Sequence, residues 1–186
     1  MKTRALTIHT VGHSTRTLEE LIAILRAHGI ERLVDVRTIP RSRQNPQFNQ
    51  ETLSKSLRNR HLSYRHMKAL GGLRHARRDS INMGWRNASF RGFADYMQTP
   101  AFAEAVEKLL LLSAEKSTAI MCAEAVPWRC HRSLIADALT ARGYQVEDIL
   151  SVTSAKPHGL TPMAKIRGQQ VTYPAEVGST GTSNQG

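Results

Sequence analysis

The densest group of side chains that could carry chemistry lies between positions 122 and 132. An apolar run ends at Cys122, a polar loop with Glu124 follows, and Cys130, His131 and Arg132 come just before a helical pattern. A thiol, an imidazole and a carboxylate can serve as nucleophile and proton carriers. An arginine at a helix start favours an anion there, because the first backbone N–H groups of a helix are free donors. The segment predicts catalytic roles for Cys122, Glu124 and His131 beside an anionic group.

Several interpretations of the two cysteines stay open. Cys122 can be a small core residue, or a nucleophile whose thiolate is favoured by Arg132, His131 and the helix dipole. Cys130 can be an inert thiol or one with a lowered pKa. The two cysteines and His131 could also bind zinc, with His13 as a fourth ligand. Because Cys-x7-Cys-His is not a usual zinc spacing, the sequence favours no metal site, and it identifies no cofactor.

Polar residues also follow other predicted strands. His13 and Ser14 come after the first strand, and Asp35 lies near the end of the second. The carboxyl ends of parallel strands share one edge of the sheet, where ligands bind. We therefore expect Asp35 to join the catalytic group or, in the simplest alternative, to pair with Arg37. The residues expected to bind the substrate or its anion are His13, Ser14, Arg37, Arg41, Arg43, Tyr64, Arg132 and Ser133.

The elements that must position these residues are strands alternating with helices. Apolar patterns predict strands at residues 6–11, 31–37, 62–66 and 144–152, and another that ends at Cys122. Helix starts and ends are indicated by Thr17 with Glu20, by Asn49, by Thr99-Pro100, and by Gly29 and Gly143. The predicted fold class is α/β. We expect a single three-layer domain with a mainly parallel sheet of about five strands and helices on both faces.

Two regions depart from this alternation. Residues 68–92 are irregular and cationic, although Trp85 and Phe90 give them apolar side chains to pack. Gly71-Gly72 within them forms a tight turn or cradles a phosphate. Residues 1–155 are expected to form the α/β domain. Residues 156–186 are expected to form an extended, partly disordered C-terminal tail, because the chain there becomes polar and rich in Gly, Ser and Thr.

The net charge of the 186-residue chain, +11, is unevenly distributed. Residues 36–94 hold 13 of the 26 Lys and Arg residues but only two carboxylates, Glu51 and Asp79. Such a basic segment indicates a phosphorylated small molecule or a nucleic acid as partner, or simply a solvated cationic face. No apolar run is long enough to span a membrane, so no membrane partner is expected. Two cysteines without an export signal predict a cytoplasmic protein with free thiols.

Six motifs in order resemble the DUF488 family. They are Thr10-Val-Gly-His-Ser-Thr, Val34-Asp-Val-Arg-Thr-Ile-Pro-Arg-Ser-Arg, Pro46-Gln-Phe-Asn, Tyr64-Arg-His, Leu70-Gly-Gly and Cys122-Ala-Glu with Cys130-His-Arg-Ser. The family is a domain of unknown function, so the resemblance implies a fold and no reaction. More loosely, Asp35-Val36-Arg37 and the strand-ending Cys122 are similar to the rhodanese layout. The loop from Cys122 to Arg132 is longer than the cysteine cradle of a sulfurtransferase.

Three hypotheses of function follow. The first is an enzyme acting on a nucleotide, a nucleic acid or another phosphorylated substrate at the carboxyl edge of the sheet. The second is a non-catalytic nucleic-acid-binding module that uses residues 36–94, with Tyr64, Trp85 and Phe90 for base stacking. The third is a thiol or metal site at Cys122 and Cys130, for sulfur transfer or redox sensing. Ionisable groups at several strand ends favour the enzyme, because a non-catalytic binder has no need of them.

Overall fold

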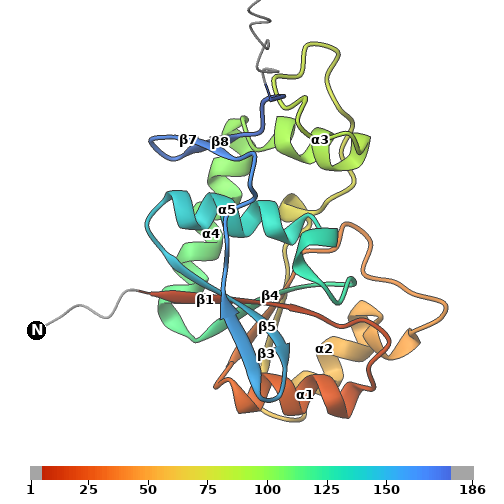
Figure 1. Ribbon diagram of the computed structural model, residues 1–186. Coiled ribbons are helices and arrows are strands. Elements are labelled where there is room, and N and C mark those ends of the chain that lie inside the picture. The colour runs from red at the N-terminus through yellow and green to blue at the C-terminus, as the bar shows by residue number, and fades with distance from the viewer. Residues whose placement is uncertain (1–5, 177–186) are drawn as a thin grey trace, which may run out of the picture.

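The computed structural model describes residues 6–176 as a central sheet covered by helices (Figure 1). The helices are α1 (Leu18–Ala27), α2 (Gln50–Arg58), α3 (Ala88–Tyr96), α4 (Pro100–Glu115) and α5 (Arg132–Ala141). The strands are β1 (Thr7–Gly12), β2 (Arg32–Asp35), β3 (Ser63–His66), β4 (Thr118–Cys122), β5 (Gln145–Ser151), β6 (Ser154–Pro157), β7 (Lys165–Arg167) and β8 (Gln170–Thr172). Three short 3-10 turns are η1 (Pro46–Phe48), η2 (Lys68–Leu70) and η3 (Pro127–Arg129).

The main sheet has six strands in the order β3-β2-β4-β1-β5-β6. Strands β1 to β5 are parallel, and β6 runs antiparallel to β5. The predicted α/β class with a mainly parallel sheet is confirmed, with one strand more than the sequence indicated. Figure 1 shows α1 and α2 on one face of the sheet and α4 and α5 on the other. This three-layer arrangement follows from the parallel strands, whose crossover connections are helices that pack on the sheet.

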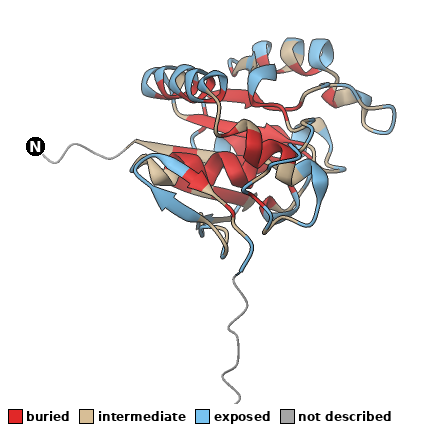
Figure 2. Cartoon of the chain, turned by 90° about the horizontal axis from the view of Figure 1, so that it is seen from above, coloured by how far each residue is buried: buried red, intermediate tan, exposed pale blue. Residues whose placement is uncertain are grey.

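Alternation along the strands explains why both faces are covered. In β4, Ile120 belongs to the core under α3, α4 and α5, whereas Ala119 and Met121 belong to the core under α1 and α2. In β2, Val34 and Leu33 divide between the same two cores. All five side chains are fully buried. Figure 2 shows that buried residues gather in the middle of the molecule and exposed residues on its outside. A strand buried on both faces tends to have a continuous apolar sequence, as Ala119–Cys122 of β4 does, whereas β2 has only Leu33-Val34 between Arg32 and Asp35.

Most of the predicted helix boundaries are confirmed by their hydrogen bonds. Thr17 and Glu20 form the reciprocal capping box at the start of α1. The Thr99 side chain accepts a hydrogen bond from the backbone N–H of Phe102 at the start of α4. Asn49 does precede α2, but its side-chain oxygen accepts from the backbone N–H of Ser42 instead of capping the helix. Asn49 therefore anchors the arginine-rich loop of residues 38–48.

Residues 156–173 pack against the domain and do not form the extended tail expected from composition. Strand β6 extends the sheet, and β7 and β8 form an antiparallel hairpin. Tyr173 is fully buried, and its hydroxyl donates to Asp137 of α5 at 2.7 Å. The polar composition concealed this packing because, among residues 156–176, only Val171 and Tyr173 are buried. Residues 177–186, the rest of the expected tail, lie outside the described residues.

A buried histidine joins this C-terminal region to the sheet and to α5. The two ring nitrogens of His158 each lie 2.9 Å from a carboxylate oxygen, one of Asp148 and one of Asp137. Burial alone would lower the pKa of His158, but the hydrogen bonds to Asp137 and Asp148 raise it from the ordinary 6.5 to about 9. Because carboxylates only accept, both ring nitrogens donate and the imidazole is cationic at neutral pH.

We expect this ion cluster to make the protein less stable in mildly alkaline solution. The folded-state pKa is raised, so the stabilisation is fully present below pH 6.5 and is lost as the pH rises to about 9. The free energy of unfolding should fall by roughly 3 kcal/mol over that interval, at 1.36 kcal/mol per pKa unit. Urea denaturation at several pH values measures it. His158→Gln should show a much flatter dependence, and an equally steep fall in that variant would contradict the assignment.

Candidate functional site

The predicted strand ends meet at one edge of the sheet. The parallel pairing sets Gly12 of β1 beside Cys122 of β4, and Asp35 of β2 beside both Met121 and His66. The expectation that the strand-end residues share an edge is therefore confirmed. Gly12 has a structural reason to be glycine, because a Cβ there would lie 1.8 Å from the carbonyl oxygen of Glu124. The loop after Cys122 packs directly on the end of β1.

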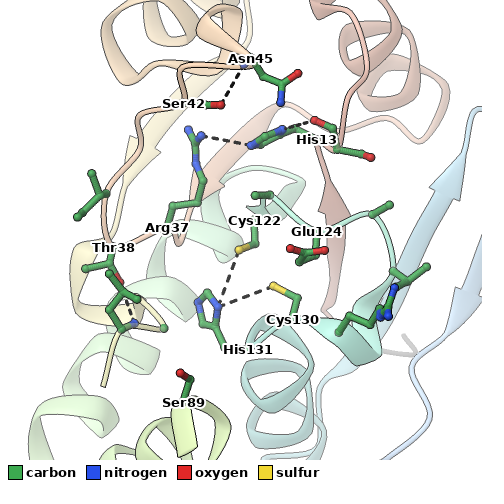
Figure 3. Close-up of a pocket in the computed structure, with 18 of the residues that line it drawn as sticks. His13, Arg37, Thr38, Ser42, Asn45, Ser89, Cys122, Glu124, Cys130 and His131 are labelled. Carbon is green, nitrogen blue, oxygen red and sulfur yellow. Dashed lines mark hydrogen bonds between the residues drawn. The ribbon is translucent and has the colours of Figure 1, made fainter. Parts of the chain in front are cut away.

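A cavity of about 840 Å³ opens above this edge (Figure 3). The predicted site residues that line it are His13, Ser14, Arg37, Arg41, Cys122, Glu124 and His131. The predicted site residues that do not line it are Asp35, Arg43, Tyr64, Arg132 and Ser133. Of the second group, Asp35, Tyr64, Arg132 and Ser133 make hydrogen bonds within the protein, whereas Arg43 is exposed.

Asp35 holds the most buried ion pair of the site. Its carboxylate accepts from the guanidinium of Arg37 at 2.9 and 2.6 Å and from the hydroxyl of Tyr64 at 2.7 Å. Asp35 is fully buried, and Arg37 is 7% exposed. Burial and the adjacent Asp35 charge raise the pKa of Tyr64, so its phenol stays protonated and donates. Asp35 and Tyr64 therefore position Arg37, in line with the pairing alternative, and neither faces the cavity.

His13 lines the cavity as a neutral side chain. Its Nδ1 lies 2.8 Å from the carbonyl oxygen of Ser14, and its Nε2 lies 3.3 Å from Nη1 of Arg37. A carbonyl only accepts, so Nδ1 carries the proton and Nε2 accepts from Arg37. Burial lowers the pKa of His13 to about 4, and the imidazole stacks on Phe48 with 4.3 Å between ring centroids. Its ring nitrogens are engaged within the protein, so His13 offers no positive charge to an anion.

Arg132 does not face a ligand, contrary to its predicted role as an anion contact. It is fully buried and donates to the backbone carbonyls of Glu124 and Ala125 and to the hydroxyl of Thr10. The hydroxyl of Ser133 likewise donates to the carbonyl of Cys130. These contacts shape the loop between β4 and α5. Their physical reason is that a fully buried guanidinium must find acceptors for its N–H groups, and the loop carbonyls supply them.

The floor of the cavity brings together Cys122, Cys130 and His131. Both sulfur atoms lie 3.8 Å from Nδ1 of His131, and the three candidate ligand atoms lie within 4.8 Å of one another (Figure 3). The interaction between the two neighbouring thiols lowers the pKa of Cys130 and raises that of Cys122. Of the described residues, this is the one group of three His, Cys, Asp or Glu side chains that could hold a metal ion.

The cavity wall is mainly cationic. Arg37, Arg41 and Arg129 line it, against the single carboxylate of Glu124. Arg41 and Arg129 are exposed, and within residues 6–176 neither makes an ion pair. Both guanidinium groups are therefore available to a ligand. Arg43 lies in the same loop as Arg41 but outside the cavity lining.

The aromatic residues proposed for base stacking are packed within the protein. Trp85 stacks on Phe90 with 4.7 Å between ring centroids and also contacts Tyr173. The hydroxyl of Tyr64 is bound to Asp35. Of the basic segment 36–94, Arg74 lies over the ring of Tyr96 at 3.6 Å. These contacts explain how an irregular segment is held without regular structure. Trp85 and Phe90 cover one face of each other, and the half-buried Phe90 also lines the cavity.

Cys130 belongs to the floor, although the sequence analysis named it only in the thiol or metal alternative. Gly71 and Gly72 follow η2 and lie against other segments, since a Cβ on Gly72 would lie 2.6 Å from Nδ1 of His131 and one on Gly71 would collide with Thr38. The pair allows two segments to approach closely. No sequence signal could have identified His131 as the neighbour of Gly72.

The sequence model of the family described as "Domain of unknown function DUF488" matches residues 17–139, more than half of the chain. The chain belongs to the DUF488 family. This match includes Asp35, Arg37, Cys122, Cys130 and His131, although the family description assigns no reaction to them. Comparison with curated proteins and with solved structures gives no match. Within residues 6–176, no helix is both long and apolar enough to cross a membrane.

Proposed function

We propose that this DUF488 protein is an enzyme that binds a small phosphorylated substrate in the carboxyl-edge cavity. The observation that carries the proposal is the position of the Cys122–Cys130–His131 group at the floor of a cavity whose wall holds three arginines and one carboxylate. Reactive side chain types and anion-binding side chains therefore border the same space. A volume of about 840 Å³ suits a molecule of the size of a nucleotide or sugar phosphate.

The roles divide by position in the cavity. Arg41 and Arg129, exposed on the wall, are the residues that we assign to the phosphate, because charge-assisted hydrogen bonds from arginine suit phosphate oxygens. Arg37 is held by Asp35 and contributes a fixed positive charge. The imidazole of His131 and the thiol of Cys122 are the side chains that we assign to the reaction. Glu124, on the loop above them, is the exposed carboxylate that could carry a proton.

The nucleic-acid-binding alternative has less support. Its stacking residues Trp85 and Phe90 are packed on each other, and Arg77 pairs with Asp79. A binding module without catalysis also has no need of two buried thiols and a histidine on the floor of its cavity. The thiol or metal alternative uses the same floor and is compatible with a phosphorylated substrate.

The test is the binding of phosphate-bearing probes to the full chain by isothermal titration calorimetry. Inorganic phosphate, ribose 5-phosphate and nucleoside mono- and diphosphates form the panel. Arg41→Ala and Arg129→Ala should each weaken the best probe by about tenfold or more, since a charge-assisted contact contributes roughly 1.5–3 kcal/mol. Arg43→Ala is the matched control in the same loop and should bind normally. Equal weakening in all three variants, or no binding by any probe, would overturn the proposal.

A further inference from the structure

The floor of the cavity has the dimensions of a metal site. The two S···Nδ1 distances are both 3.8 Å. A tetrahedral zinc ion with usual bond lengths to sulfur and nitrogen separates these ligand atoms by about 3.6 Å. Both S···Nδ1 distances are therefore within a few tenths of an ångström of the coordinated value, and all three ligand atoms lie within 4.8 Å of one another.

The protein fixes the ring of His131 in the tautomer that a metal ligand requires. Nε2 lies 3.1 Å from the carbonyl oxygen of Val36 and 3.0 Å from that of Leu70. Both partners only accept, so Nε2 carries the proton and the lone pair of Nδ1 points at the two sulfurs (Figure 3). A backbone carbonyl that accepts from the second nitrogen is the usual support of a metal-bound histidine.

The ring is also held from its sides. Phe93 meets it edge-on with 5.0 Å between centroids, and Gly72 leaves room for it because any Cβ there would collide with the imidazole. A general base must only be able to exchange a proton. A metal-binding histidine, in contrast, binds the ion more tightly when contacts fix the direction of its ring. The surroundings of His131 therefore favour coordination.

The ligand types and their charge indicate the class of ion. Cys122 is 8% exposed and Cys130 3% exposed, and each sulfur has only weak polar partners within the protein. Two thiolates and one divalent cation have no net formal charge, so the buried group would be electrically balanced. Sulfur and imidazole ligands select zinc-class ions over magnesium or calcium. Binding would release the thiol protons to solvent.

The fourth position faces the cavity. All three ligands line the cavity, and within residues 6–176 no further His, Cys, Asp or Glu completes the cluster. His13, the fourth ligand considered from the sequence, is engaged with Ser14 and Arg37. Three protein ligands with one open position are typical of catalytic zinc sites, whereas structural sites use four.

We propose that Cys122 Sγ, Cys130 Sγ and His131 Nδ1 bind one zinc-class divalent cation whose open coordination position faces the cationic cavity. The role of this ion as the reacting centre rests on the proposed function, whereas its binding does not. The sequence alone favoured no metal site, because a spacing of seven residues between the cysteines is unusual. In the fold, the loop between β4 and α5 brings both sulfur atoms to 3.8 Å from Nδ1 of His131.

The experiment titrates the untagged, reduced full chain with Co²⁺ and then displaces it with Zn²⁺. We expect one Co²⁺ per chain, with sulfur-to-cobalt charge-transfer absorption and the intense visible bands of a tetrahedral ion. Cys122→Ser, Cys130→Ser and His131→Ala should each weaken binding by at least about 100-fold, since even second-shell changes cost 10–100-fold. His75→Ala, an exposed histidine outside the cavity, is the matched control and should retain the spectrum.

Two further measurements keep the result clear if a ligand variant misfolds. Gly72→Ala retains every ligand but displaces His131, so it should weaken Co²⁺ binding by about tenfold or more. In the unmodified chain, Zn²⁺ should protect both thiols from alkylation by iodoacetamide. Absence of the charge-transfer band, or full alkylation in the presence of Zn²⁺, would overturn the metal site.

Different results would overturn the proposed metal site and the proposed substrate class. Loss of cobalt binding with intact, Arg41-dependent phosphate binding would overturn the metal site alone. A cobalt spectrum without binding of any phosphate probe would confirm the metal site and overturn the substrate class.

Discussion

Asp35→Asn is expected to destabilise the protein by about 3–5 kcal/mol, because it leaves the buried guanidinium of Arg37 without its counter-charge. Asp35 is fully buried and accepts hydrogen bonds from Arg37 and from Tyr64. An asparagine amide cannot neutralise the charge, and its NH₂ group would face a donor. Urea denaturation at neutral pH measures the difference in the free energy of unfolding.

A matched aspartate in the same chain provides the control. Asp79 pairs with Arg77 at 2.8 Å, but both side chains are largely exposed. Asp79→Asn should therefore leave stability almost unchanged, because solvent screens an exposed ion pair. The double variant Asp35→Asn/Arg37→Met should recover part of the loss, because it removes the unpaired buried charge. Equal effects of the two aspartate substitutions would show that Asp35 is not held in a desolvated pair.

Arg132→Ala is expected to lower stability by about 3–5 kcal/mol and to disorganise the loop between β4 and α5. Arg132 is fully buried, and its guanidinium supplies donors to the carbonyls of Glu124 and Ala125. Each buried acceptor left without a donor costs about 1–3 kcal/mol. Arg132→Lys should also be destabilised, since one ammonium group cannot reproduce the planar fork. Thermal and urea denaturation measure both.

Arg129→Ala provides the contrasting result. Arg129 is exposed on the cavity wall three residues earlier, so its removal should leave stability within about 0.5 kcal/mol and weaken phosphate binding. Substitution of Arg132 should thus lower stability, whereas substitution of Arg129 should lower the affinity for phosphate. An Arg132→Ala protein of normal stability that no longer binds phosphate would restore Arg132 as an anion contact, as the sequence first indicated.

The sequence by itself determined the class of fold and the edge at which the site lies. Ile120 lies in the apolar run that ends at Cys122, Val34 lies in a mainly apolar stretch, and Thr17 with Glu20 marks a helix start. Such signals depend on neighbours within a few residues, so they can be read along the chain. Once the strands are parallel, their carboxyl ends share an edge, which is why Asp35 and Cys122 could be predicted to meet there.

Only the tertiary structure decided the strand order, the antiparallel β6 and the packing of the C-terminal hairpin. The pairing of β1 with β4 and β5 joins segments that are far apart in sequence. Tyr173 is buried because its hydroxyl reaches Asp137 of α5, a partner 36 positions away. Long-range partners leave no periodic signal in the residues around them.

The roles of the site residues also depended partly on the sequence and partly on the tertiary structure. Residue types near Cys122 were visible in the sequence, but the direction of each side chain was not. Arg132 was expected to face a ligand and instead turns into the protein, where the carbonyls of Glu124 and Ala125 accept its hydrogen bonds. His131 faces the two sulfurs because the carbonyls of Val36 and Leu70, 95 and 61 positions away, hold its other nitrogen. Local patterns therefore specify which groups reach the edge of the sheet, whereas the choice between ligand, support and counter-ion depends on hydrogen-bond partners that only the folded chain brings together.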